Sequence, residues 1–151
     1  MNKIKQLKPS KQSRYEQGYV NLKSCKKIFP QLKQEKVIYR SSYEKYFIIW
    51  LESCKKVKHW GSECLCIPYT SAIDGKIHHY YPDYFIELED GTGVVVEVKP
   101  FNQTQKPINE NSYAHKEYVK NMSKWKAAQE FCNKKGYQFK IITEKTIDKL
   151  H

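Results

Sequence analysis

One short run, Val94–Lys99, constrains the fold more than any other part of this chain. It is nearly all apolar, which is typical of a strand covered on both faces of a sheet. Because side chains alternate along a strand, Val95, Glu97 and Lys99 share one face. Charged groups inside such a strand are costly unless they are paired or bind a metal. The run therefore predicts a functional site on a covered strand, with a plain Glu97–Lys99 surface pair on an edge strand as the alternative.

A second carboxylate, Asp83, follows Pro82 on the preceding predicted strand. Two carboxylates on neighbouring strands can hold one or two hard cations through oxygen. Directly opposed residues of an antiparallel hairpin face the same way. A two-residue turn at Asp90-Gly91 would place Asp83 opposite Val98, on the wrong face. A shared site with Glu97 therefore requires a loop of odd length, such as 89–91, or a bulge.

The pattern Asp83, Glu97, Lys99 suits phosphodiester hydrolysis. A bound cation would neutralise the phosphate, lower the pKa of its water and steady the leaving oxygen. Lys99 could orient the attacking water or offset charge at phosphorus. Glu44 is a third acidic candidate, because Ser41-Ser42-Tyr43-Glu44 matches a capping box. Glu44 would either accept a hydrogen bond from the Ser41 amide or reach the metal site, directly or through water.

The remaining patterns predict one mixed sheet flanked by helices, an α/β fold. A helix begins at Ser41 and ends before Lys55, and a late helix has Ser123 as its N-cap and Gly136 as its stop. The other expected elements are a turn at 59–62, strands at 63–69, 77–89, 94–99 and 138–143, turns at 71–75 and 90–93, a loop at 100–107, and helices at 112–122 and 144–150.

Charge is distributed unevenly along the 151 residues, which carry a net +11. Residues 1–60 have 15 Lys and Arg against 4 Asp and Glu, residues 61–100 have 2 against 7, and residues 101–151 have 10 against 5. Basic flanks suit a polyanion such as DNA, and an acidic centre tolerates phosphates when a metal lies between. We expect a basic, partly ordered arm at 1–35 and one domain at 36–151, although a basic tail can also serve solubility.

Composition also excludes several classes. There is no run of eighteen apolar residues, so we expect no membrane span, and the basic start is not followed by the apolar run of a secretory signal. Five cysteines, an odd number without a CxxC pair, indicate reduced thiols in a cytosolic setting. The His78-His79 pair with Cys64 and Cys66 lacks zinc-ligand spacing, so we expect no zinc.

The order of these motifs resembles the PD-(D/E)XK nuclease superfamily, which has the restriction-endonuclease-like fold. More narrowly, it is similar to the head completion nucleases of T4-like tailed phages over roughly residues 37–150. The start of the first helix also looks like that of the transposon end-cleaving TnsA-type nucleases. The stretches that carry the resemblance are Tyr39–Lys45, Trp60–Glu63, Ile67–Tyr69, Glu97–Pro100 and Lys124–Gln129.

The resemblance implies a set of roles and a setting. Asp83, Glu97 and the Val98 backbone carbonyl would bind Mg²⁺ or Mn²⁺, Lys99 would act on water or phosphate, and Glu44 would be an accessory acid. The substrate would be double-stranded DNA and the partners phage head and portal proteins, in the host-cell cytoplasm during assembly and then on the virion. Gln129 is an accessory candidate. The candidates for DNA contact are Arg40, Lys45 and Lys126.

Two other functions remain open at this stage. One is a structural head-assembly protein that uses a nuclease-like scaffold and has little activity. The other is a junction resolvase or transposon-end endonuclease of the same superfamily. The intact Asp83, Glu97 and Lys99 favour an enzyme over a scaffold, because a pure scaffold has no use for them.

Overall fold

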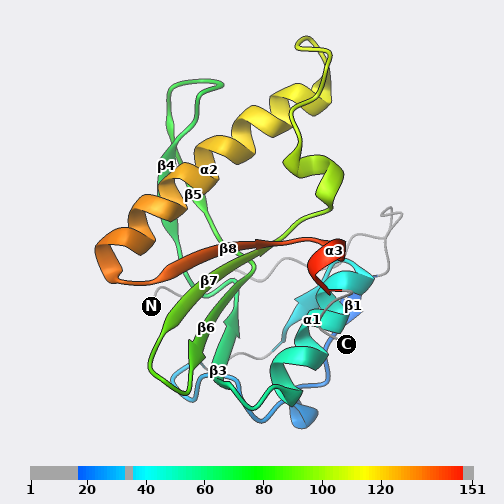
Figure 1. Cartoon of the computed structure of the whole chain (residues 1–151), viewed down its shortest axis with the longest axis vertical. Helices are drawn as coiled ribbons and strands as arrows, with labels where there is room; N and C mark the ends of the chain where they lie inside the picture. The colour runs from blue at the N-terminus through cyan, green and yellow to red at the C-terminus, as the bar shows by residue number, and fades with distance from the viewer. Residues whose placement is uncertain (1–16, 33–35, 148–151) are drawn as a thin grey trace.

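The computed structural model describes residues 17–32 and 36–147, and its centre is a four-stranded mixed sheet (Figure 1). The strand order is β3-β6-β7-β8, in which β3, β6 and β7 are antiparallel and β8 runs parallel to β7. The predicted α/β fold with a mixed sheet is confirmed. The strands of this sheet are β3 (Val57–Ser62), β6 (Tyr84–Leu88), β7 (Gly93–Val98) and β8 (Gln138–Ile142).

Smaller elements complete the described part of the chain. A second pair of strands, β4 and β5, forms its own two-stranded sheet next to the main one. The remaining elements are β1 (Gly18–Tyr19), η1 (Leu22–Ser24), β2 (Ile38–Tyr39), α1 (Ser42–Ser53), β4 (Ile67–Thr70), β5 (Ile77–Tyr80), η2 (Phe101–Thr104), α2 (Tyr113–Lys135) and α3 (Glu144–Ile147).

The β6–β7 hairpin has the register that a shared carboxylate site requires. Tyr84 pairs with Val96, and Leu88 and Thr92 close the hairpin through a 2.9 Å hydrogen bond from the Leu88 amide to the Thr92 carbonyl. The loop is therefore 89–91, and its last residue, Gly91, has a φ of 88°, a left-handed conformation that glycine adopts without strain. The prediction of an odd-length loop is confirmed, and one further step of the register brings Asp83 opposite Glu97.

A parallel β7–β8 pair needs a long crossover, and α2 supplies it. The sequence predicted two helices, at 112–122 and 123–135, but the structure has a single helix that begins after the N-cap Ser112. The Ser123 hydroxyl donates to the Val119 carbonyl at 3.2 Å, so Ser123 lies inside the helix and is not an N-cap. Ser is favoured at helix starts, but inside a helix its hydroxyl can instead bond the carbonyl four residues earlier, as Ser123 does here. The predicted stop at Gly136 is confirmed by its φ of 74°.

The predicted turn at 59–62 is wrong, because these residues belong to β3. Gly61 suggested a turn, but its lack of a side chain serves close packing. An added Cβ at Gly61 would lie 2.5 Å from the Leu32 side chain and 2.8 Å from the Cys64 sulfur. Trp60, its neighbour, is fully buried. A glycine inside a strand can thus mark a tight contact with another segment.

The predicted strand at 77–89 is divided in two by Tyr81-Pro82-Asp83. The first part, β5, pairs with β4, and the second part, β6, joins the main sheet. Proline has no N–H to donate to a ladder, which favours a break at Pro82. The predicted strand at 63–69 begins only at Ile67, because Glu63 has a left-handed φ of 49° that interrupts the extended chain.

Two hydrophobic clusters lie on the two faces of the sheet. The first joins α1 and α3 to residues such as Tyr84 and Val96, and the second joins α2 to β4, β5 and the β8 residues Phe139 and Ile141 (Figure 1). Glu97 is aligned with Ile141 in the ladder, so it faces the second cluster. The chain passes from the second cluster, which contains Tyr80, to the first, which contains Tyr84, at residues 81–83, so Asp83 lies at the junction of the two clusters.

The described part of the predicted arm packs on the domain. β1 pairs with β2, Ile28 forms a bridge with Trp60, and Phe29 is only 3% exposed. Residues 17–32 therefore contribute to the core around β3, and the boundary expected at residue 35 does not separate them from it. Residues 1–16, 33–35 and 148–151 lie outside the described residues, so the arm stays a prediction for the first sixteen.

Candidate active site

Asp83 is held across the β6–β7 hairpin by the backbone. Its Oδ2 accepts a 2.7 Å hydrogen bond from the Val98 amide, and its own carbonyl accepts a 2.9 Å bond from the Glu63 amide. The first bond joins the residue just before β6 to the end of β7. It fixes the Asp83 carboxylate against the end of β7, beside Glu97.

Glu97 is buried, with 7% of its surface exposed, and both of its carboxylate oxygens have partners. Oε2 accepts a hydrogen bond of 2.5 Å from the Tyr80 hydroxyl, and the Lys99 Nζ lies 3.5 Å from Oε1. Glu97 and Lys99 thus share one face, as their spacing predicted. A carboxylate held on both oxygens has little freedom to rotate, which suits a metal ligand.

The negative charges of the site act on one another. Burial raises the pKa of Asp83 well above its usual value, and the nearby carboxylates of Glu97 and Glu44 raise it further. The Val98 amide and the Lys99 ammonium oppose this shift in pKa only in part. Such a cluster favours the binding of a cation, which would allow the carboxylates to ionise together.

Glu44 takes part in a capping-box arrangement and also interacts electrostatically with the other carboxylates. The Ser41 hydroxyl accepts from the Glu44 amide at 3.2 Å, and Glu44 Oε2 accepts from an upstream amide at 3.1 Å, as in a capping box. The amide belongs to Arg40, not to Ser41 as predicted. The backbone is extended at Ser41, and the N–H of the preceding residue, Arg40, therefore points toward the Glu44 carboxylate. Burial raises the pKa of Glu44 to about 7, Arg40 lowers it, and Glu63 and Glu97 raise it, so Glu44 also belongs to the acidic centre.

Arg40 and Glu63 form an ion pair at the edge of this centre, which sequence reasoning missed. Arg40 also interacts electrostatically with Glu44 and Asp83. Its Nη2 is buried without a hydrogen-bond partner among the described residues. The left-handed backbone of Glu63 directs the chain away from β3 at this point, and a non-glycine residue in that conformation often marks a functional site. The signal available in the sequence was Glu63, a charged residue directly after the buried end of β3.

Tyr80 is the other residue that the sequence did not identify. The Tyr80-Tyr81 pair was attributed to core packing and strand propensity, and Tyr80 is indeed buried. Its hydroxyl nevertheless donates to Glu97, and burial together with Glu97 raises its pKa, so Tyr80 stays protonated as a donor. Its position three residues before Asp83, on the other side of Pro82, was the only hint in the sequence.

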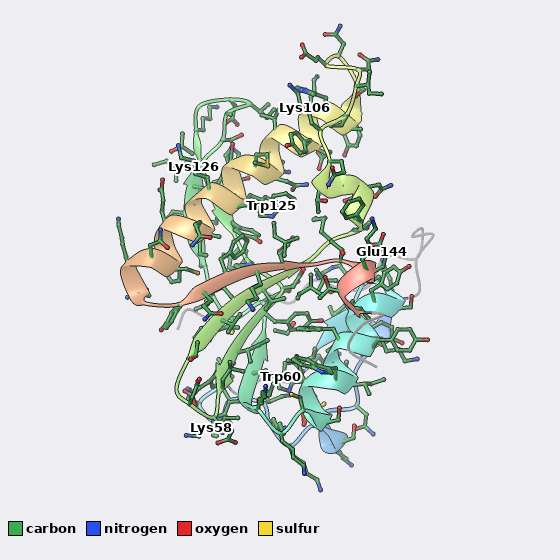
Figure 2. All side chains as sticks on the ribbon, in the orientation of Figure 1. Lys58, Trp60, Lys106, Trp125, Lys126 and Glu144 are labelled. Carbon is green, nitrogen blue, oxygen red and sulfur yellow. The ribbon has the colours of Figure 1, made fainter. Side chains whose placement is uncertain are left out.

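Three of the predicted accessory residues are not brought to the centre. Gln129 is exposed and donates to Asn133 at 2.9 Å. Lys126 is exposed and lines a hollow of about 1180 Å³ between α2 and β4, whereas Trp125 points into the core (Figure 2). The Lys45 ammonium lies 5.7 Å from the centre of the Tyr39 ring. Arg40 does interact with the acidic centre, through its ion pair with Glu63 and electrostatically with Glu44 and Asp83.

The donor set that could hold a metal is small. Among residues 17–32 and 36–147, no group of three or more His, Cys, Asp or Glu side chains is arranged to hold an ion. Asp83 and Glu97 therefore provide two carboxylates, and the Val98 carbonyl was predicted as a third oxygen. Oxygen donors with open positions for water and phosphate are typical of Mg²⁺ sites.

Comparison with known proteins shows the family of this chain. A family model described as the TnsA-like endonuclease N-terminal domain matches residues 54–144. The chain belongs to the TnsA-like endonuclease family. Head completion nuclease of Enterobacteria phage T4 is 36% identical over 120 residues, which cover 73% of this chain and 80% of that protein. The resemblance inferred from the motifs is thereby confirmed.

The segment matched by the endonuclease family contains the central residues of the site, Asp83, Glu97 and Lys99, together with Glu63. Glu44 precedes it and enters the site from α1. In the part of the chain that the structure describes, no helix has the length and apolar character needed to cross a membrane.

Proposed function

We propose that this TnsA-like endonuclease is a divalent-metal-dependent enzyme that hydrolyses phosphodiester bonds of double-stranded DNA. One observation carries the proposal. The Val98 amide holds Asp83 beside Glu97, and the Lys99 ammonium lies 3.5 Å from the Glu97 carboxylate. Two hard carboxylates and a cation on one face match the requirements of phosphate chemistry.

Asp83 and Glu97, with the Val98 carbonyl, would hold Mg²⁺ or Mn²⁺. The fit is supported by the raised pKa of Asp83, which reflects buried like charges that a divalent cation would balance. When bound, the ion supplies charge neutralisation at the phosphate and a more acidic water. Glu44 adds a further carboxylate to the electrostatics of the centre.

The chain's own residues would then orient the reactants. Lys99 can donate hydrogen bonds to the attacking water or to a non-bridging phosphate oxygen, because an ammonium has three donors. The water oxygen forms a bond to phosphorus and gives up one proton, the bond from phosphorus to one sugar oxygen breaks, and that leaving oxygen takes up one proton, so that the protons balance. Glu97 keeps Lys99 near the reacting atoms, and Tyr80 keeps Glu97 in place.

The biological setting follows from the relative. That relative is named a head completion nuclease, and we propose that the present chain likewise acts in phage head completion after DNA packaging, with head and portal proteins as partners. Assembly would take place in the cytoplasm of the infected host, with the protein then carried on the virion. A net charge of +11 suits a protein that meets packaged DNA.

The proposal is tested by cleavage of supercoiled and linear DNA in Mg²⁺ and in EDTA. We expect cutting that requires the metal and is lost in Asp83→Ala and Lys99→Ala, while the exposed Glu110→Ala control cuts normally. Metal binding measured by calorimetry should be lost in Asp83→Ala as well. DNA binding without cutting in Mg²⁺ or Mn²⁺ would favour a structural assembly protein, and a strong preference for branched DNA would favour a resolvase.

A further inference from the structure

Helix α2 packs on β4 and β8 and carries a lysine, Lys124, that interacts electrostatically with Glu97 and that the catalytic motif does not include. The Lys124 Nζ lies 5.5 Å from the centre of the Tyr80 ring, and the Tyr80 hydroxyl donates to Glu97. Lys124 on α2 thus contacts the Tyr80 ring, and Tyr80 in turn contacts the Glu97 carboxylate. A cation over an aromatic face is attracted by the ring, so Tyr80 fixes the position of the ammonium.

The charge of Lys124 is only partly compensated by the protein. Lys124 is half-buried, and no carboxylate among the described residues lies within ion-pair distance of its Nζ. Burial lowers the pKa of Lys124, as do the positive charges of Lys120 and Lys99, while the carboxylates of Glu97 and Glu117 raise it. Arg40 and Lys99, the other cations at the centre, each have a carboxylate partner.

A half-buried ammonium without an ion pair costs folding energy unless it meets an anion from outside. Lys124 and Lys99 lie close enough to affect each other electrostatically, so such an anion would lie near both. The anion available to a nuclease is a phosphate of its substrate. We propose that Lys124 is a substrate-binding residue, which donates to a phosphate oxygen of the DNA strand held at the Asp83–Glu97 centre, with Tyr80 as its positioning residue. This inference rests on the proposed nuclease function.

The direction of the bound strand follows from the next basic residue on the helix. Lys120 lies about one turn before Lys124, about 6 Å along the helix axis, and the two charges interact. Like charges on adjacent turns repel each other, and a polyanion lying along them relieves that repulsion. The DNA backbone would therefore leave the centre along α2, toward the N-terminal end of the helix.

The test compares Lys124→Met and Lys124→Arg with Lys134→Met. Methionine keeps an apolar stem over the Tyr80 ring, arginine restores the charge, and Lys134 is an exposed lysine of the same helix. Binding of linear double-stranded DNA is measured in EDTA at several salt concentrations, and single-turnover cleavage in Mg²⁺. Circular dichroism melts check that all three variants are folded.

We expect Lys124→Met to bind and cut about tenfold less well, with a salt dependence of log K reduced by about one ion. Lys124→Arg should recover most of the binding, and Lys134→Met should behave as wild type. If Lys124→Met matches Lys134→Met in both salt dependence and rate, the inference is wrong. Should the wild type fail to cut at all, the nuclease proposal fails, and the salt dependence in EDTA still decides whether Lys124 binds phosphate.

Discussion

Replacing Glu44 by glutamine should make the metal-free protein more stable at alkaline pH. Glu44 is 9% exposed, and its pKa of about 7 compares with an ordinary value of 4.5. Burial is the main cause, and the carboxylates of Glu63 and Glu97 add to it. The glutamine side chain would keep an oxygen to accept from the Arg40 amide, as Glu44 does at 3.1 Å, but would carry no charge.

The size of the effect follows from the difference between the two pKa values. Because the folded pKa is raised, the folded state favours the protonated carboxyl, so this contribution to stability is complete below pH 4.5 and is lost as pH rises through 7. The full difference corresponds to about 3 kcal/mol. Relaxation around the carboxylate and imperfect hydrogen bonding by the glutamine reduce this, so we expect a gain of about 1–3 kcal/mol for Glu44→Gln at pH 8.

The assay is urea unfolding in EDTA at pH 5 and pH 8. The free energy of unfolding of wild type should fall between these pH values, and that of Glu44→Gln should fall less, with Asp83 accounting for the remaining slope. The exposed Glu110→Gln variant is the matched control and should leave the slope unchanged. A Glu44→Gln protein no more stable than wild type at pH 8 would refute a destabilising carboxylate at this position. The same variant should cut DNA more slowly, since it removes an acidic group of the centre.

Three further results are expected. Tyr80→Phe should weaken Mg²⁺ binding in calorimetry and slow cleavage about tenfold, because Glu97 loses a hydrogen bond. DNA binding in EDTA should stay unchanged, and a loss of DNA binding would argue against a role of the Tyr80 hydroxyl in holding Glu97. Addition of Mg²⁺ should raise the Tm of wild type but not of Asp83→Asn, and equal shifts would exclude Asp83 as a ligand. Gly61→Ala should lower the free energy of unfolding by about 1–3 kcal/mol, because the new methyl would meet Leu32, and an unchanged urea midpoint would contradict this.

The sequence predicted the centre of the site well because that part depends on local geometry. Alternation along β7 places Glu97 and Lys99 on one face, and the hairpin register then requires a loop of odd length for Asp83. These are constraints of the backbone alone, and they hold whatever packs around them. The resemblance to nucleases added expected roles for these residues but did not alter their placement.

Other parts of the site depend on contacts between distant segments. Tyr80 and Lys124 are 44 positions apart, and the packing of α2 on the β4–β5 pair brings the ammonium over the ring. The contact of Gly61 with the segment at 17–32 is equally invisible in sequence, so its strand was predicted as a turn. A glycine in the sequence can mark either a turn or a close approach of another segment, and the sequence alone does not distinguish the two.

The position of the site between two hydrophobic clusters has a consequence during biosynthesis. Glu44 lies on α1, which packs in the first cluster, and Tyr80 belongs to the second. Asp83 lies at the point where the chain passes from the second cluster to the first. Neither half contains a complete centre. A nascent or partly folded chain would therefore be harmless to the DNA around it, and cleavage would begin only when the whole domain has formed.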